Sequence, residues 1–181
     1  MPKIINFSGQ ARHGKTSAAE ILKEVLEERG KRVLVINYAD YLKFICKEYF
    51  GWDGTKSEKG RTILQKYGTD IVRQRDPDFW VRAVGNFVDV FCEDFDFILT
   101  SDCRFRNEVE YFIPIYRTLN VKVSRNNFDN GLTDEQKNHP SERDLDNYNF
   151  DYEIYSDSGL DNLSQAVNWF VESLDAMYWI E

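Results

Sequence analysis

The chain of 181 residues has few of the residues that build metal sites and disulfide frameworks. Its three cysteines and two histidines show no C-x-x-C pair and no spacing typical of zinc ligands. We interpret Cys46, Cys92 and Cys103 as reduced thiols of a cytoplasmic protein. The N-terminus does not resemble a signal peptide. No apolar run approaches the roughly 18 residues of a membrane span, so we expect no membrane as a partner.

Basic residues are also in deficit. Lys and Arg number 23 against 31 Asp and Glu, which gives a net charge of −8. A sequence-independent surface for duplex nucleic acid needs clustered Lys and Arg, so we expect no such partner. Repeats, low-complexity tracts and domain linkers are not recognisable. The length fits a single domain, residues 1–181, with a sizeable core.

The most informative stretch is GQARHGKT, at residues 9–16. Gly9, Gly14, Lys15 and Thr16 complete the G-x-x-x-x-G-K-[ST] pattern of a phosphate-binding loop, the P-loop. Glycines allow backbone N–H groups to point at phosphate oxygens, and the helix that follows turns its positive end to the anion. Lys15 is expected to reach the outer phosphates, and the Thr16 hydroxyl to ligate Mg²⁺.

The flanking sequence agrees with this interpretation. Residues 3–7 form a short apolar stretch typical of a strand, and residues 17–29 have helical apolar spacing. A chance match to the motif would rarely lie between a strand and a helix. The sequence therefore predicts nucleotide binding, although the P-loop does not specify the reaction.

Strands and helices alternate along the rest of the chain. This pattern predicts an α/β P-loop NTPase fold: a doubly wound parallel sheet of about five strands, with ligands beyond the strands' carboxyl ends. The polar segment 126–149 is expected to be a lid or binding loop. Further strands are predicted at 32–38, 95–101, 121–124 and 151–155, a loop at 51–60, and helices at 40–50, 61–73, 78–92, 105–119 (bent or broken around Pro114) and 160–174.

Polar and charged residues follow several predicted strands. Asp102 could hold Mg²⁺ or its waters opposite Thr16, or could simply cap a helix. Arg104 can grip phosphate oxygens with two N–H groups. Asp40 and Arg125 also stand at strand ends, so all these side chains are expected near one ligand site.

A second group lies on one predicted helix. Arg61, Gln65, Thr69 and Arg73 are spaced by four residues and share a slowly drifting face. Two arginines, an amide and a hydroxyl suit a nucleotide's phosphate, base edge and sugar. The alternative is an ordinary solvated face. His139-Pro140-Ser141-Glu142 could be a turn leading to a capped helix, and with one His and no Cys nearby we expect no metal there.

In combination, these motifs resemble the phage-type deoxynucleoside monophosphate kinases, within the P-loop nucleoside monophosphate kinase group. The resemblance covers most of the chain, and the ordered combination is more specific than the P-loop alone. Its pieces are GQARHGKTSAAEIL from Gly9, YADYLK from Tyr38, LQKYGTDIVR from Leu64, DPDFWV from Asp76, SDCRFRNEVE from Ser101, HPSE from His139 and DYEIYSDSGLDNL from Asp151.

The resemblance implies transfer of the ATP γ-phosphoryl group to a deoxynucleoside monophosphate, giving the diphosphate and ADP. Such kinases have a core, a helical monophosphate-binding insertion (here about 39–90) and a short lid (about 126–147). They act in the cytoplasm, which is the host's if a phage encodes the protein. The lid departs from the arginine-dense type, since only Arg125 and Arg143 lie near it, and the compact insertion leaves the base preference unassigned.

The resemblance also implies roles for individual residues. Lys15, Arg104 and Arg125 are expected to be catalytic. ATP is expected to contact Gly9, Arg12, His13, Gly14, Lys15, Thr16, Ser17 and Arg143, with Mg²⁺ on Thr16 and on Asp102, directly or through water. The acceptor is expected to contact Asp40, Lys43, Arg61, Gln65, Thr69, Arg73, Trp80, Asp102, Arg104, Glu108, His139 and Glu142.

Two other functions remain open at this point. One is a small-metabolite P-loop kinase, such as a dephospho-coenzyme A kinase. The other is a nucleotide-gated binding protein whose loops contact a partner, although a switch has no need for an arginine-lined second pocket. The aromatic tail 177–180 is either core packing or an association surface, so a homodimer is a candidate assembly.

Overall fold

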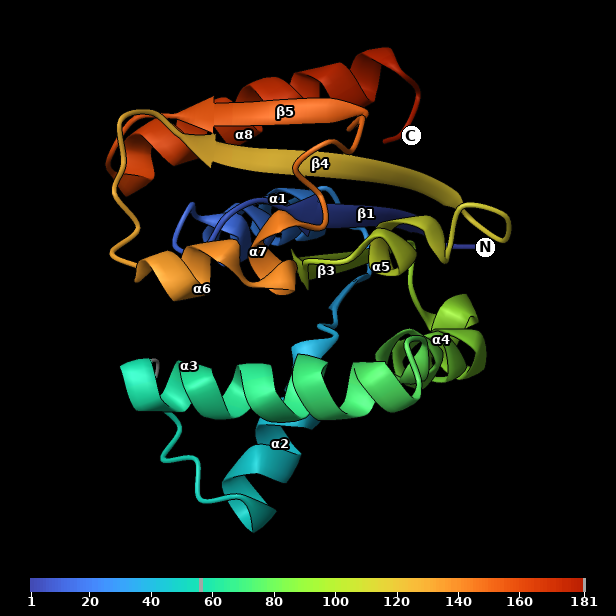
Figure 1. Ribbon diagram of the computed structural model, residues 1–181. Helices are drawn as coiled ribbons and strands as arrows, with labels where there is room; N and C mark the ends of the chain where they lie inside the picture. Colours follow the sequence, from blue (N-terminus) through green and yellow to red (C-terminus); the bar gives the residue numbers. More distant parts are fainter. Residues whose placement is uncertain (56, 181) are drawn as a thin grey trace.

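A computed structural model describes residues 1–55 and 57–180. Its centre is a parallel five-stranded sheet with the strand order β2-β3-β1-β4-β5 (Figure 1). This order, with helices on both faces, confirms the α/β doubly wound fold. The strands are β1 (Lys3–Ser8), β2 (Val33–Val35), β3 (Phe97–Cys103), β4 (Arg117–Arg125) and β5 (Tyr152–Ser156).

Alternating side chains of the strands pack on two separate helical layers. Ile5 and Phe7 lie in one buried cluster with α1 (Lys15–Glu28) and α8 (Leu160–Ala176). Ile4 lies in a second cluster with α4 (Phe79–Phe91) and the short α5 (Arg106–Glu110). Successive strand residues point to opposite faces, so central strands must be apolar on both sides.

A helical layer is inserted between β2 and β3. It contains α2 (Ala39–Tyr49), α3 (Glu58–Gln65), the π-helix η1 (Lys66–Arg73) and α4, and the 3₁₀-helix η2 (Cys92–Asp94) leads into β3. These helices enclose their own apolar cluster around Leu42, Cys46, Trp52 and Trp80. The insertion therefore has an apolar cluster of its own, while α4 also packs on the sheet.

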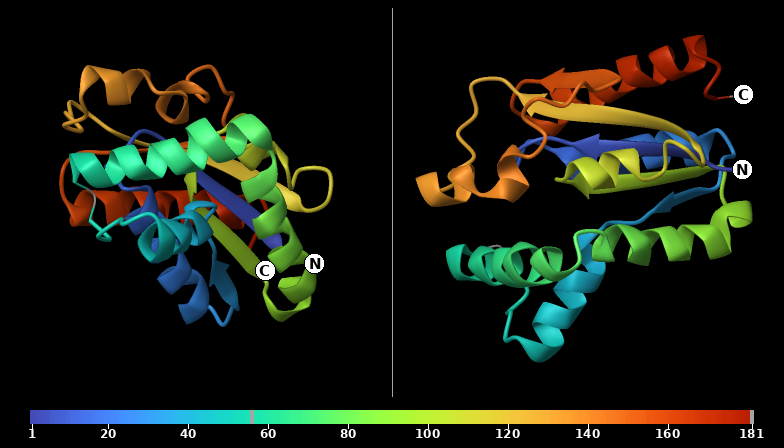
Figure 2. Two further views of the ribbon diagram at one scale, coloured as in Figure 1. Left: turned by 60° about the horizontal axis from the view of Figure 1, so that its bottom comes forward. Right: turned by 45° about the vertical axis from the view of Figure 1, so that its right-hand side comes forward.

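The predicted lid segment contains two short helices, α6 (Asp134–Asn138) and α7 (Pro140–Arg143). Both lie at the carboxyl ends of the strands, opposite α3 (Figures 1 and 2). The sequence pattern predicted no helix at α6, and it indicated only a turn leading to a capped helix at residues 139–142, because each helix spans only about one turn.

The prediction of a helix over 105–119 was mostly wrong. Helix α5 ends at Glu110, turns follow, and β4 begins at Arg117 instead of residue 121. Pro114 cannot continue a helix. Residues 117–120 instead pair with β1 through residues 3–6, so tertiary pairing overrides their local preference.

Smaller differences concern the second strand and the insertion. The strand expected over 32–38 is limited to Val33–Val35. Helix α2 begins at Ala39, one residue before the predicted start at residue 40, and its last residue, Tyr49, is 72% exposed. Helix α3 begins at Glu58, inside the predicted loop 51–60, of which residue 56 lies outside the described residues.

The aromatic tail, residues 177–180, is partly buried in the core and partly exposed. Trp179 is 5% exposed and belongs to the α1–α8 cluster, whereas Tyr178 is 75% exposed. Core packing is thus correct for Trp179, and a homodimer stays a prediction. Within the part of the chain that is described, no helix has the length and apolarity needed to cross a membrane.

The first glycine of the P-loop should be a strict requirement of the fold. Gly9 has φ +131°, and a Cβ there would lie 2.3 Å from the Val123 carbonyl oxygen. Gly30 also has positive φ, +77°, but a Cβ would meet nothing within 4 Å. We expect Gly30→Ala to lower the free energy of unfolding by about 1–2 kcal/mol, and Gly9→Ala by more than about 4 kcal/mol. Urea unfolding of both variants tests this, and equal losses would contradict it.

Candidate active site

The P-loop joins β1 to α1 and wraps around the Lys15 side chain. Gly9 and Gly14 both have positive φ, +131° and +93°. The Lys15 ammonium group donates to the carbonyl oxygens of Gly9 and Gln10, each at 2.8 Å. The glycines thus permit the tight turn of the loop backbone, and the two hydrogen bonds of Lys15 stabilise it.

Lys15 lies in an environment that disfavours its own charge. Burial lowers the pKa of Lys15 well below its usual range, and the nearby Arg104 charge lowers it further. A phosphate group beside Lys15 would act in the opposite direction, because an adjacent anion favours the ammonium form. The site is therefore electrostatically suited to an anion.

His13 of the P-loop contacts Arg125, the last residue of β4. The Arg125 backbone N–H donates to His13 Nδ1 at 3.0 Å, and the Arg125 guanidinium lies 3.7 Å from the centre of the Phe128 ring. Burial, followed by the charges of Lys15 and Arg125, lowers the pKa of His13. A neutral His13 agrees with Nδ1 accepting a hydrogen bond.

Other residues expected on the ATP side lie around the same loop. Arg12 donates to the Asn130 carbonyl oxygen at 2.9 Å, which ties the P-loop to the lid segment. Thr16 is exposed and Ser17 half-buried at the start of α1. Arg143 lines a cavity of about 270 Å³ together with Gln10.

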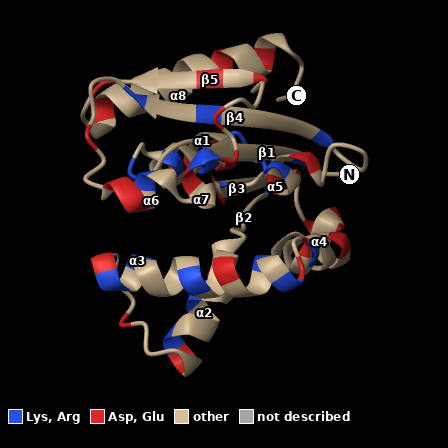
Figure 3. Cartoon of the chain, in the orientation of Figure 1, with Lys and Arg blue, Asp and Glu red and all other residues tan. Residues whose placement is uncertain are grey.

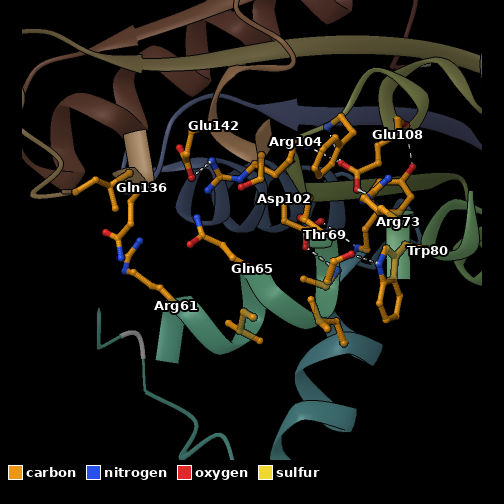
Figure 4. A pocket seen from close by; sticks show the side chains of 18 residues that line it. Arg61, Gln65, Thr69, Arg73, Trp80, Asp102, Arg104, Glu108, Gln136 and Glu142 are labelled. Atoms are coloured by element: carbon orange, nitrogen blue, oxygen red, sulfur yellow. Dashed lines mark hydrogen bonds and ion pairs between the residues drawn. The ribbon is translucent and has the colours of Figure 1, made fainter. Parts of the chain in front are cut away.

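A second cavity, of about 200 Å³, lies between the insertion, the end of β3 and the lid (Figure 4). Nine of the twelve residues predicted to contact the acceptor line it: Arg61, Gln65, Thr69, Arg73, Trp80, Asp102, Arg104, Glu108 and Glu142. Most of the polar side chains that line this cavity were therefore named from the sequence.

The π-helix aligns the four-residue series on the insertion. Residues four apart are rotated by about 40° relative to each other around an α-helix. The side chains of Arg61 and Gln65 in α3 therefore do not point in quite the same direction. A π-helix has i→i+5 hydrogen bonds and more than four residues per turn. In η1, residues four apart are therefore rotated in the opposite sense, which compensates for the rotation in α3. Thr69 and Arg73 are thereby kept on the face of Gln65, and all four line the cavity. Trp80 Nε1 donates to the Gly68 carbonyl oxygen at 3.0 Å and ties α4 to η1.

Asp102 adopts the helix-capping arrangement. Its two carboxylate oxygens accept hydrogen bonds from the backbone N–H groups of Tyr38 and Ala39, at 3.0 and 2.9 Å. Burial raises the pKa of Asp102, while the Ala39 amide opposes the rise. Asp102 therefore fixes the start of α2 against the end of β3.

Glu108 connects the insertion to the sheet. It is 3% exposed, forms an ion pair with Arg73 and accepts from the backbone N–H groups of Arg104 and Phe105, at 2.6 and 3.0 Å. The Arg73 guanidinium also lies 3.9 Å from the centre of the Phe105 ring. Glu108 thus orients Arg73 and the start of the segment that carries Arg104.

Arg104 points into the cavity and meets the lid there. Its Nη1 lies 2.7 Å from Glu142 Oε1 (Figure 4). Glu142 Oε2 also accepts a hydrogen bond from the Ala11 backbone N–H of the P-loop at 3.1 Å. A carboxylate thus already occupies an anion-binding amide of the loop. This amide of the P-loop therefore donates to an anionic oxygen, as the amides of a phosphate-binding loop do.

Three predicted acceptor residues lie outside this cavity. Asp40 and Lys43 pair with each other at 2.8 Å on the exposed side of α2. His139 Nε2 lies 3.4 Å from Asp70 Oδ1, between the lid and η1. Sequence reasoning missed other lining residues because apolar or lid residues carry no spacing signal; they are Tyr38, Ala39, Leu42, Leu64, Gly68, Phe105, Leu132, Gln136 and Ser141.

In the described part of the chain, no cluster of three or more His, Cys, Asp or Glu side chains could hold a metal. Such a cluster is not needed for a Mg²⁺ ion that is carried largely by nucleotide phosphates, waters and one or two protein oxygens. The hydroxyl of Thr16, at the start of α1, is compatible with that kind of binding.

A P-loop facing an arginine-lined cavity, on this fold, defines a P-loop phosphotransferase. A model of the deoxynucleotide monophosphate kinase family matches residues 35–167, well over half of the chain. The chain belongs to this family. It is a nucleotide kinase that phosphorylates deoxynucleoside monophosphates.

A solved structure agrees at the level of the fold. The shikimate kinase of Bacteroides thetaiotaomicron has 11% identity and a TM-score of 0.53, covering 96% of this chain and 98% of its own. The APS kinase of Mycobacterium tuberculosis has 15% identity and a TM-score of 0.48, covering 94% and 97%. No curated protein sequence matches the chain.

The environment of Glu108 predicts a pH dependence of stability. Burial raises the pKa of Glu108 to about 7, against the opposing effect of Arg73. The folded state therefore holds a proton that the unfolded state has lost between the usual value of 4.5 and about 7. The stabilising contribution is full below 4.5 and is lost as the pH rises through about 7.

We expect the difference in free energy of unfolding between wild type and Glu108→Gln to fall as the pH rises through this window. Urea unfolding across the window measures it. Glu110→Gln is the matched control, because Glu110 is exposed and pairs only loosely with Arg106, at 3.7 Å. A difference that stays flat would mean that Arg73 keeps Glu108 ionised throughout.

Proposed function

We propose that ATP binds on the P-loop, with its phosphates along Gly9 to Thr16, and that the deoxynucleoside monophosphate enters the cavity of about 200 Å³. Arg61, Gln65, Thr69 and Arg73 then line the path of the acceptor. Its phosphate meets Arg104, at the end of the cavity nearest the P-loop.

The observation that carries this proposal is the position of Arg104. Arg104 lines the acceptor cavity and also a cavity of about 160 Å³ that Gly9 and Gln10 line. A guanidinium shared by two such cavities can contact the phosphates of two ligands at once. A protein that only binds one nucleotide has no use for this arrangement.

Positioning and charge neutralisation supply most of the rate in phosphoryl transfer. Lys15 and Arg104 offset negative charge on the transferring group, with Arg125 and Arg143 contributing from the P-loop wall and the lid. The acceptor phosphate is already ionised, so the reaction requires no general base. The lid excludes water from the reacting groups.

Mg²⁺, when bound, neutralises charge on the β- and γ-phosphates. The Thr16 hydroxyl would hold it directly, and Asp102 would hold one of its waters. Both Asp102 oxygens already cap α2, so Asp102 retains only its remaining lone pairs for this second role.

The small-metabolite acceptor left open by the sequence serves as the comparison against which the deoxynucleoside monophosphates are tested. The fold is shared with the shikimate kinase structure, but the likeness extends to the fold alone. An ADP-release assay against dTMP, dGMP, dCMP, dAMP and dUMP, with ribonucleotides and dephospho-coenzyme A as controls, decides between the two. Turnover of dephospho-coenzyme A above all nucleotides would overturn the proposed acceptor.

The two central cations should be required for turnover but not for folding. We expect Lys15→Ala and Arg104→Ala each to lower kcat by about 10²–10³-fold, as removal of one preorganised donor to a developing charge does. Steady-state ADP release measures the effect, with unfolding curves as a check on the fold. Arg106→Ala is the matched control, because Arg106 is exposed on α5 and paired with Glu110. Near-normal turnover of both site variants would refute the assignment.

A further inference from the structure

Glu142 touches both halves of the site at once. Its carboxylate contacts the Arg104 guanidinium at 2.7 Å and the Ala11 amide of the P-loop at 3.1 Å. The side chain of Glu142 is only 10% exposed, and that of Arg104 24%. The contact is therefore a partly buried, charge-assisted pair, stronger than an ordinary surface ion pair.

Both partners of Glu142 are groups that suit phosphate. Ala11 is the third residue of the P-loop, whose backbone amides point at anions, and a guanidinium binds phosphate and carboxylate with similar geometry. A carboxylate in this place imitates a phosphate group. Like charges so close repel strongly, so Glu142 and a substrate phosphate cannot use Arg104 together at low cost.

Glu142 also stands where three cavities meet. It lines the acceptor cavity, the cavity of about 270 Å³ beside Gln10 and Arg143, and the cavity of about 160 Å³ beside Gly9. Movement of this one side chain would therefore join the acceptor cavity to the space beside the P-loop.

We propose that Glu142 is a specificity-determining residue that favours transfer to a nucleotide over transfer to water. Its carboxylate holds Arg104 until the acceptor phosphate displaces it. An acceptor phosphate carries the charge needed to displace a carboxylate from Arg104, whereas a neutral water molecule does not. This inference rests on the proposed function and gives Glu142 the role of competing with phosphate.

The two competing reactions break the same bond. The bond between the γ-phosphorus of ATP and its bridging oxygen breaks, and ADP leaves with the electron pair. In transfer, an ionised oxygen of the acceptor phosphate forms the new bond, giving a diphosphate. In hydrolysis, the oxygen of water forms it, giving inorganic phosphate and a proton. While Glu142 holds Arg104, the positive charge of the Arg104 guanidinium is not available beside the γ-phosphate for either reaction.

Glu142→Gln tests the proposal, because the amide keeps an oxygen for the Ala11 N–H but loses the charge that holds Arg104. We expect acceptor-free ATP hydrolysis, measured as phosphate release, to rise about tenfold. We expect the Kd for inorganic pyrophosphate, measured by calorimetry, to fall about tenfold, since the ligand no longer displaces a charged competitor. Glu142→Ala should change both in the same direction.

Glu110→Gln is the matched control: the same chemical change on an exposed glutamate outside the cavities, with no effect expected. In an Arg104→Ala background, the effect of Glu142→Gln on hydrolysis should disappear, because the competitor has no cation to hold. Unchanged hydrolysis, weaker pyrophosphate binding, or an effect that persists without Arg104 would each overturn the proposal.

These readouts use ATP and pyrophosphate alone. A wild-type protein that turns over none of the deoxynucleoside monophosphates would refute the proposed acceptor, whereas the comparison of Glu142→Gln with wild type would still judge whether Glu142 holds back Arg104. The two failures are therefore distinguishable.

Discussion

The cavity between the insertion and the sheet depends on one buried ion pair, between Arg73 of the π-helix and Glu108 of α5. Removing one partner of such a pair typically costs about 3–5 kcal/mol, because the other charge stays buried and unpaired. Glu108 also holds the backbone amides of Arg104 and Phe105. A single carboxylate thus sets the distance between the insertion and the sheet, and the direction of the segment that carries Arg104.

Carboxylates organise a site whose ligand is an anion. The chain has a net charge of −8, yet three arginines, Arg61, Arg73 and Arg104, line the cavity. Figure 3 shows Lys and Arg positions along α3, interspersed with Asp and Glu. Close arginines repel each other and need anionic partners. Glu108 is the fixed partner of Arg73, whereas Glu142 reaches Arg104 from the lid. The first pair gives the site its shape, and the second is suited to exchange with phosphate.

The sequence was most informative where the chemistry is local. The P-loop, β1 and α1 follow from contiguous residues, because the glycine positions, the apolar strand and the helical periodicity all lie within about 30 residues. The four-residue series on α3 and η1 was also recognisable, although its π-helical turn was not. Residues 105–119 were misjudged because a helix-compatible composition could not reveal pairing with β1, about 110 positions away.

The sequence by itself therefore determined the fold class, the P-loop and the charged residues that line the cavity of about 200 Å³. Only the tertiary structure decided what each charge contacts. Asp102 caps α2 rather than standing free, Asp40 and Lys43 pair outside the cavity, and Glu142 reaches the P-loop from 131 positions away. The physical reason is that glycine and helical patterns act through the local backbone. The partner of a charged side chain depends on which strand ends the sheet brings together, and residue spacing does not encode that.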